Sequence, residues 1–146
     1  MTTTSATAIT NLLYRYAELV DAGDFDALSA MFADADYLMR GGAALRGQHV
    51  GAAMRATVKL YDGSPRTRHV MTNAIVEVAD DNASATARSS FTVFQATDGF
   101  PLQAILIGGY HDTFVNDAGW RFARREIHVD LVGDTSHHVR ISMGGD

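Results

Sequence analysis

A histidine and an asparagine share one side of a segment that alternates like a β-strand. Between residues 68 and 78, one parity carries His69, Met71, Asn73 and Ile75, and side chains of one parity share a strand face. An imidazole exchanges protons near neutral pH, so His69 could act as a general base in a pocket wall that includes Met71 and Asn73. A histidine hydrogen-bonded inside the core fits the same pattern, and the strand taken alone favours this structural role.

Other polar residues give weaker signals of a site. Asp21 follows the apolar stripe of the first helical segment and, taken alone, is a solvated acid at a helix end. Tyr16 lies within that stripe as a core residue whose hydroxyl needs a partner. Arg124 and Arg125 face opposite sides of the last predicted strand, so one of them could point inward. A buried arginine would then require an anion or strong acceptors.

No metal site and no phosphate-binding loop is expected. His137 and His138 adjoin in a polar tail without Asp or Glu at ligand spacing, which is typical of exposed residues. Strand alternation separates His111 from Asp112. The chain has no cysteine, which excludes disulfides, cysteine nucleophiles and thiolate ligands. Neither a glycine-rich phosphate loop nor a G-x-S-x-G motif is present.

Composition predicts one soluble globular domain over residues 1–146, with residues 133–146 as a polar tail. The chain has 146 residues, 47% hydrophobic and 20% charged, enough for a sizeable core. Its net charge of -5 disfavours a nucleic-acid partner. No apolar run is long enough for a membrane span. The opening residues MTTTSATAIT resemble no signal peptide, so we expect a cytoplasmic protein.

The order of predicted elements indicates an α+β fold. Helical spacing predicts helices over residues 5–22, 24–32 and 47–61, and alternation predicts strands over 36–40, 68–78, 83–95, 102–115 and 120–132. Three N-terminal helices packed on a curved, mainly antiparallel sheet would form a cone-shaped α+β barrel with a hollow for a small ligand. Three helices cannot cover both sheet faces, so we expect a homodimer or homotrimer.

Three stretches of the chain resemble the SnoaL-like branch of the nuclear-transport-factor-2-like superfamily. They are YRYAELVDAGDFDALSAMFADADY, TRHVMTNAIVEV and GGYHDTFVNDAGWRFARREIHVDL. The first resembles the opening helix-turn-helix, the second the strand that bears a histidine, and the third the closing hairpin. The resemblance covers nearly everything from residue 9 to residue 134. It is specific for the fold and less so for an activity, because one fold hosts many functions.

The resemblance implies a catalytic pair. In members such as scytalone dehydratase and hexachlorocyclohexane dehydrochlorinase, an Asp at the end of the first helix orients a His on the strand, and Asp21 and His69 match these positions. Arg125 falls at the dehydrochlorinase's pocket arginine, and Tyr16 at its pocket lysine. The second catalytic histidine of scytalone dehydratase has no counterpart between residues 88 and 94. Neither specific activity therefore transfers.

The resemblance makes a cofactor-independent lyase or isomerase our first hypothesis. His69 would take a proton from carbon of a small, mostly apolar cyclic or polyketide-like substrate, and Arg125 or Tyr16 would stabilise the leaving group or an enolate oxygen. The pocket would be lined by Met54, Val58, Met71, Phe91 and Ile107. The alternative is a non-catalytic ligand-binding or assembly module, such as the small subunit of a ring-hydroxylating dioxygenase. A hydrolase resembling limonene epoxide hydrolase ranks last, because no second pocket Asp is evident.

Overall fold

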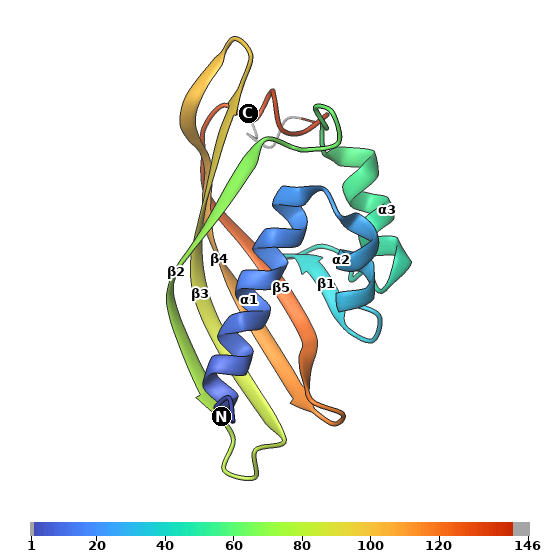
Figure 1. The fold of residues 1–146 in the computed structure, drawn as a ribbon, viewed down its shortest axis with the longest axis vertical. Coiled ribbons are helices and arrows are strands. Elements are labelled where there is room, and N and C mark those ends of the chain that lie inside the picture. Colours follow the sequence, from blue (N-terminus) through green and yellow to red (C-terminus); the bar gives the residue numbers. More distant parts are fainter. Residues whose placement is uncertain (1, 142–146) are drawn as a thin grey trace.

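Three helices and a five-stranded sheet make up the fold (Figure 1). The computed structural model describes residues 2–141. Its helices are α1 (Ser5–Ala22), α2 (Phe25–Met31) and α3 (Gln48–Thr57). Its strands are β1 (Asp36–Met39), β2 (Thr67–Val78), β3 (Ser84–Thr97), β4 (Phe100–Asn116) and β5 (Trp120–Val132). The sheet order is β1-β5-β4-β3-β2, in which only the β1–β5 pair is parallel.

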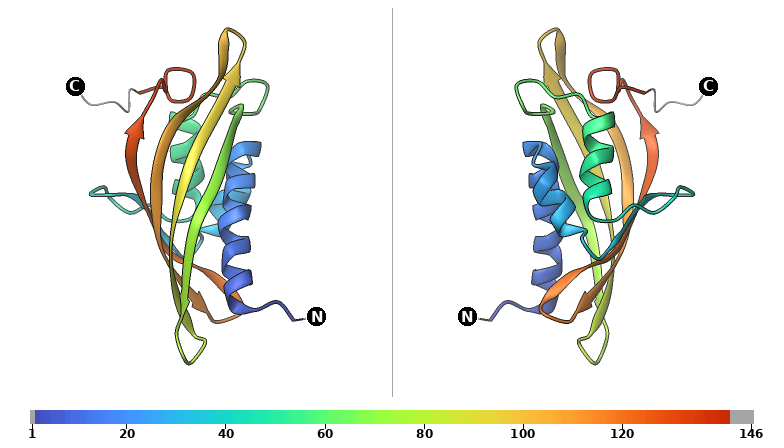
Figure 2. Two further views of the ribbon diagram at one scale, coloured as in Figure 1. Left: turned by 90° about the vertical axis from the view of Figure 1, so that its left-hand side faces the viewer. Right: turned by 90° about the vertical axis from the view of Figure 1, so that its right-hand side faces the viewer.

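The predicted α+β architecture is confirmed. The helices lie on one face of the sheet, which curves around them and does not close (Figure 2). Strand β2 is an edge strand, and α1 runs beside it. The end of α1 and the start of β2 therefore meet at one margin of the molecule.

Helix α1 forms where the sequence predicts it because its local signals agree with its packing. Its apolar stripe buries Ile9, Leu13 and Val20. The Thr4 side chain accepts a hydrogen bond from the Thr7 amide, which caps the N-terminus. The third helix is shorter than predicted and ends at Thr57. Its predicted continuation leaves the helix because Val58 instead forms a β-bridge with Val139.

A β-bulge in β2 overturns the single parity that the sequence suggested. The register with β3 shifts between Thr72 and Ile75, and Asn73 adopts a positive φ of 54°. The extra residue moves the following side chains to the opposite face. Asn73 is exposed and Ile75 is 46% exposed. The prediction that Asn73 lines the pocket wall with His69 was therefore wrong, and Ile75 does not share the strand face of His69.

The outer face of the sheet carries exposed apolar side chains. Val70, Ile107 and Leu131 lie on one row across β2, β4 and β5, linked through Thr92 of β3, and are 39%, 37% and 63% exposed. Ile107 therefore faces away from the helices, which overturns its predicted place in the pocket. Gly108 follows at a bend where a Cβ atom would lie 2.0 Å from the His128 carbonyl oxygen, so only glycine fits.

Within residues 2–141, none of the helices is both long and apolar enough to span a membrane.

Candidate active site

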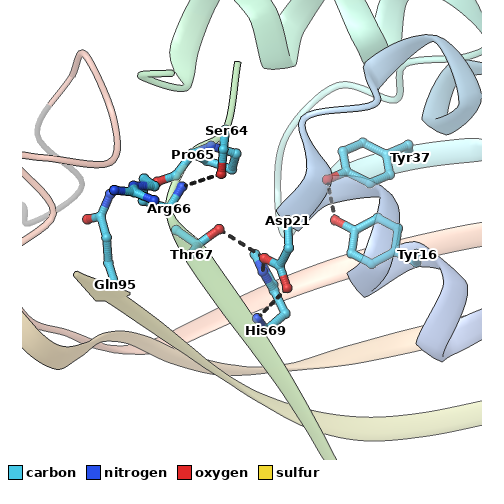
Figure 3. Close-up of polar contacts among 9 residues, drawn as sticks. All are labelled: Tyr16, Asp21, Tyr37, Ser64, Pro65, Arg66, Thr67, His69 and Gln95. Carbon is cyan, nitrogen blue, oxygen red and sulfur yellow. Dashed lines mark hydrogen bonds and ion pairs between the residues drawn. The ribbon is translucent and has the colours of Figure 1, made fainter. Parts of the chain in front are cut away.

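Asp21 and His69 are joined where the end of α1 meets the start of β2 (Figure 3). The Asp21 Oδ1 atom lies 2.6 Å from His69 Nδ1 and accepts a second hydrogen bond from the Thr67 hydroxyl at 2.9 Å. Oδ2 accepts the backbone N–H of His69 at 2.8 Å. The side chains of His69 and Asp21 are only 8% and 13% exposed, respectively. Asp21 is therefore not a solvated acid.

These bonds determine how the histidine is oriented. An ionised carboxylate only accepts hydrogen bonds, so Nδ1 of His69 carries the proton that lies between the two groups. The lone pair of the neutral ring is then on Nε2, which has no hydrogen-bond partner among residues 2–141. Asp21 thus holds both the ring and its tautomer in the form that a general base needs.

The position of Asp21 would be unfavourable without these partners. It lies in the last turn of α1, where the helix dipole disfavours a negative charge. Three hydrogen bonds from β2 offset this effect. The approach of the two elements depends on Gly23, which ends α1 with a φ of 71° and whose added Cβ would lie 2.5 Å from the Gly63 carbonyl oxygen.

A groove of about 670 Å³ runs along this junction. Its lining combines apolar, acidic and basic side chains from α1, from β2, from the turn that precedes β2 and from the end of β3: Tyr14, Ala17, Glu18, Asp21, Ala22, Ser64, Arg66, Thr67, Arg68, His69, Met71 and Ala96. Of the predicted pocket residues, the groove brings together Asp21, His69 and Met71.

The remaining predicted lining residues lie elsewhere. Val58 and Phe91 are 4% and 3% exposed and belong to the hydrophobic core, and Met54 packs against that core. Asn73 sits in the exposed bulge and Ile107 on the outer face. The prediction assumed one hollow between helices and sheet, but aromatic side chains fill much of that space, including stacked Phe32 and Phe122.

Arg125 and Tyr16 are also in the core. The Arg125 guanidinium is completely buried and binds both carboxylate oxygens of Asp112 at 2.9 Å. It lies over the rings of Tyr16 and Tyr110, at 4.2 Å and 3.6 Å from their centroids. The Tyr16 hydroxyl is 2.7 Å from that of Tyr37, and burial raises the pKa of Tyr16. Arg125 therefore has its anion inside the protein, which sequence alternation could not reveal.

His138 is the residue that sequence analysis misjudged most. The tail was expected to be exposed, yet His138 is 6% exposed and Val139 pairs with Val58; residues 142–146 of the tail lie outside the described part. Burial lowers the pKa of His138 to about 4, His69 contributes to the lowering, and Asp21 opposes it. His138 therefore lies close enough to the pair for their charges to act on it. No local pattern marks this residue.

The buried state of His138 predicts a stability that depends on pH. Because its pKa falls from 6.5 to about 4 on folding, the unfolded chain binds more protons between these values, and acidification favours unfolding. The free energy of unfolding should drop by roughly 2–3 kcal/mol from this group between about pH 7 and about pH 4.5. Urea titrations should show a correspondingly smaller drop for His138→Gln. An exposed control, His49→Gln, should behave as wild type; equal pH dependence in wild type and His138→Gln would contradict the prediction.

In the part of the chain that the structure describes, no group of three or more His, Asp or Glu side chains is arranged to hold a metal ion.

Comparisons with known proteins agree with this architecture. The SnoaL-like domain family profile matches residues 1–126. An NTF2-like protein with a cystatin-like fold from Novosphingobium aromaticivorans is 29% identical, with a TM-score of 0.68 over 89% of this chain and 84% of that chain. No curated protein matches the sequence.

Two further solved structures from the same organism share the fold. One, provisionally described as a scytalone dehydratase, is 22% identical, with a TM-score of 0.67 over 87% of this chain and 85% of that chain. The other, the beta subunit of a protein provisionally described as an aromatic-ring-hydroxylating dioxygenase, is 18% identical, with a TM-score of 0.66 over 92% of this chain and 95% of that chain. At these identities the likeness concerns the fold alone.

Proposed function

The chain belongs to the SnoaL-like domain family, and from this premise we propose that it is a cofactor-independent lyase or isomerase acting on a small cyclic or polyketide-like substrate. The observation that carries the proposal is the hydrogen bond between Asp21 and His69 at the groove. Members of one fold differ in activity, so the proposal depends on the side chains and not on the fold.

The proposed reaction begins with proton transfer from carbon. Nε2 of His69 takes a proton from a carbon next to a carbonyl group, and the C–H electron pair moves into the carbonyl to give an enolate. In a dehydration, the His69 imidazolium gives its proton to the hydroxyl group that leaves the neighbouring carbon, which departs as water; in a dehydrohalogenation, halide leaves and the imidazolium releases its proton to solvent. In an isomerisation, the imidazolium returns the proton to another carbon. Asp21 stabilises the imidazolium that forms between the two steps.

The groove has suitable dimensions and polarity for such a substrate. Its volume of about 670 Å³ lies in the range of small-molecule sites. Met71 and Ala17 offer apolar contact for a ring, and Arg66 and Arg68 offer cationic donors for oxygen substituents. The groove is open at the surface and not enclosed in the core, which suits a substrate with polar groups at its rim.

The wild-type protein tests this proposal directly. Cyclic β-hydroxy and β-halo ketones in deuterium oxide should lose water or halide, or exchange their acidic C–H for deuterium, as followed by proton NMR. A nitro-substituted benzisoxazole, which releases a coloured phenolate when its C–H proton is removed, gives a second readout. Rates no faster than those of free imidazole at the same concentration would contradict an enzymatic role.

The alternative proposal is a non-catalytic subunit. It is supported by the shared fold of the dioxygenase beta subunit, of which this chain covers 95%. The exposed row of Val70, Ile107 and Leu131 is compatible with either a second copy or a larger partner. Gel filtration separates the two: a stable homodimer or homotrimer that eliminates the probe supports the enzyme, whereas an inactive chain that requires a catalytic partner for solubility supports the subunit.

A further inference from the structure

The carboxylate of Asp21 is held by three donors that all come from one short stretch of β2. The Thr67 hydroxyl and His69 Nδ1 both reach Oδ1, at 2.9 Å and 2.6 Å, and the backbone N–H of His69 reaches Oδ2 at 2.8 Å. Two of these donors belong to the proposed base itself. The third, the Thr67 hydroxyl, can be removed without touching the imidazole that transfers the proton.

Strand geometry explains why Thr67 and His69 bind the same carboxylate. Residues two apart in a β-strand point to the same face, and both side chains project from β2 toward Asp21 at the end of α1 (Figure 3). Threonine is branched at Cβ, which restricts its χ1 torsion and suits it to a strand. Thr67 therefore holds its hydroxyl in a defined direction.

The backbone beside Thr67 is fixed by the neighbouring strand. Gln95 of β3 is the register partner of Thr67 and is buried. Its amide nitrogen donates to the carbonyl oxygens of Pro65 and His137, each at 3.0 Å. The turn that precedes β2 cannot shift without breaking these bonds, so the Thr67 hydroxyl approaches Asp21 from a fixed position.

Thr67 acts on the groove through Asp21. It lines the groove together with Asp21 and His69. Its single O–H is used by Asp21, because an ionised carboxylate only accepts hydrogen bonds. The hydroxyl therefore does not donate to a substrate while this bond is intact, and its effect on the reaction passes through the carboxylate.

The orientation of the carboxylate depends on Thr67 because Oδ1 is shared. The last torsion of an aspartate side chain is broad, so the hydrogen bonds to its oxygens decide where Oδ1 lies. Without the hydroxyl, the carboxylate can tilt toward solvent, because Asp21 is not completely buried. The Nδ1 proton of His69 then loses its aligned acceptor, and small losses of alignment at a reacting group slow catalysis.

We propose that Thr67 is a positioning residue, which holds Oδ1 of Asp21 in line with Nδ1 of His69 while Nε2 takes the proton of the substrate. This inference rests on the proposed function and adds Thr67 to the Asp21–His69 pair. It requires that the hydroxyl of Thr67, and not the bulk of the side chain, determines the rate.

Benzisoxazole elimination provides the first test. His69 Nε2 removes the C–H proton, the C–H electrons form the third bond of a nitrile, and the N–O bond breaks with its electron pair moving to the phenolate oxygen. Thr67→Val has nearly the shape of threonine without the hydroxyl, so kcat should fall roughly 10-fold with KM little changed. Thr67→Ser keeps the hydroxyl and should recover most of the rate. Thr72→Val, at an exposed position of the same strand, is the matched control and should keep the wild-type rate.

Two further measurements distinguish positioning from a purely structural role. In an Asp21→Asn background, Thr67→Val should lower the rate much less than it does in wild type, because a residue that acts through Asp21 is not additive with the loss of Asp21. NMR of protein with isotope-labelled histidine reads the tautomer of neutral His69 without any substrate. Wild type and Thr67→Ser should hold the proton on Nδ1, whereas Thr67→Val should show a larger share of the Nε2–H form. A change in stability alone would produce neither result.

Several results would overturn the inference and leave the proposed function intact, given an inactive His69→Gln protein. They are a wild-type kcat in Thr67→Val, a loss that Thr67→Ser does not recover, an equal loss in the Asp21→Asn background, and an unchanged tautomer of His69 in Thr67→Val. Wild-type activity in His69→Gln would instead remove the proposed function and, with it, the role of Thr67. Thr67→Ala also lacks the hydroxyl and replaces Thr67→Val in each test if the valine variant does not fold.

Discussion

Replacement of Asp21 by Asn should slow proton abstraction by about 10²–10⁴-fold while the protein remains folded. Replacement of His69 by Gln should have an effect of similar size, because it removes the base itself. Both losses should appear in kcat more than in KM, since neither change removes a group that binds the ring of the substrate.

The physical reason lies in the tautomer of His69. Asp21 accepts three hydrogen bonds, two of them from His69. Asn has a similar shape, but its amide nitrogen is a donor. If that nitrogen faces Nδ1, the ring places its proton on Nε2 and loses the lone pair that takes the substrate's proton. If it faces the backbone N–H of His69 instead, two donors oppose each other at the start of β2.

Elimination of the nitro-substituted benzisoxazole measures this prediction in both single variants and in the double variant. Groups that act as one unit are not additive, so the double variant should be no slower than the slower single variant. Asp98→Asn in an exposed turn is the matched control and should keep the wild-type rate. If the elimination rate of the Asp21→Asn protein is within threefold of the wild-type rate, a difference of roughly 0.7 kcal/mol in activation free energy, the role of the carboxylate is refuted.

Sequence patterns predicted the elements well because local and tertiary preferences agree in them. The first helix was predicted with the observed bounds, residues 5 to 22, since its cap, its apolar stripe and its terminal glycine all indicate the same element. The last strand, residues 120 to 132, was likewise predicted with its observed bounds. Where packing depends on residues distant in sequence, as at Val58 and Val139, the predicted helix was too long.

The site was predictable only in part, for identifiable reasons. Asp21 and His69 lie 48 positions apart, so only the family resemblance suggested that they meet. Periodicity of two cannot anticipate a bulge, which is why Asn73 was placed wrongly. His138 was missed because its burial results from contacts with α3 and β3, and no signal in residues 133–146 indicates them.

Arg125 illustrates a different limit of sequence reasoning. The sequence indicated that a buried arginine needs an anion but did not identify the anion. In the sheet, Asp112 of β4 is the direct register partner of Arg125 in β5, and both side chains are 0% exposed. Burial raises the pKa of Asp112, an effect that the neighbouring guanidinium opposes. The pair therefore depends on each partner for its charge to remain in the core.

Replacement of Asp112 by Leu should accordingly lower the free energy of unfolding by about 3–5 kcal/mol, because it leaves the Arg125 cation buried without an anion. Aromatic rings at 3.6–4.9 Å from the guanidinium would offset only part of this loss. The corresponding Arg125→Met variant leaves the Asp112 carboxylate buried without a cationic partner, and its free energy of unfolding should fall by a similar amount.

The double variant Asp112→Leu/Arg125→Met distinguishes the net contribution of the ion pair to the free energy of unfolding from the destabilisation that results when one buried charge loses its partner. It removes both charges and fills the space with apolar atoms, so its stability should return to within about 1–2 kcal/mol of wild type. Urea unfolding of the four proteins measures the coupling. If the free energy of unfolding of a single variant falls by less than about 1 kcal/mol, the remaining charge reaches solvent or is neutralised. A double variant as unstable as either single one would mean that the pair contributes packing that aliphatic side chains cannot replace.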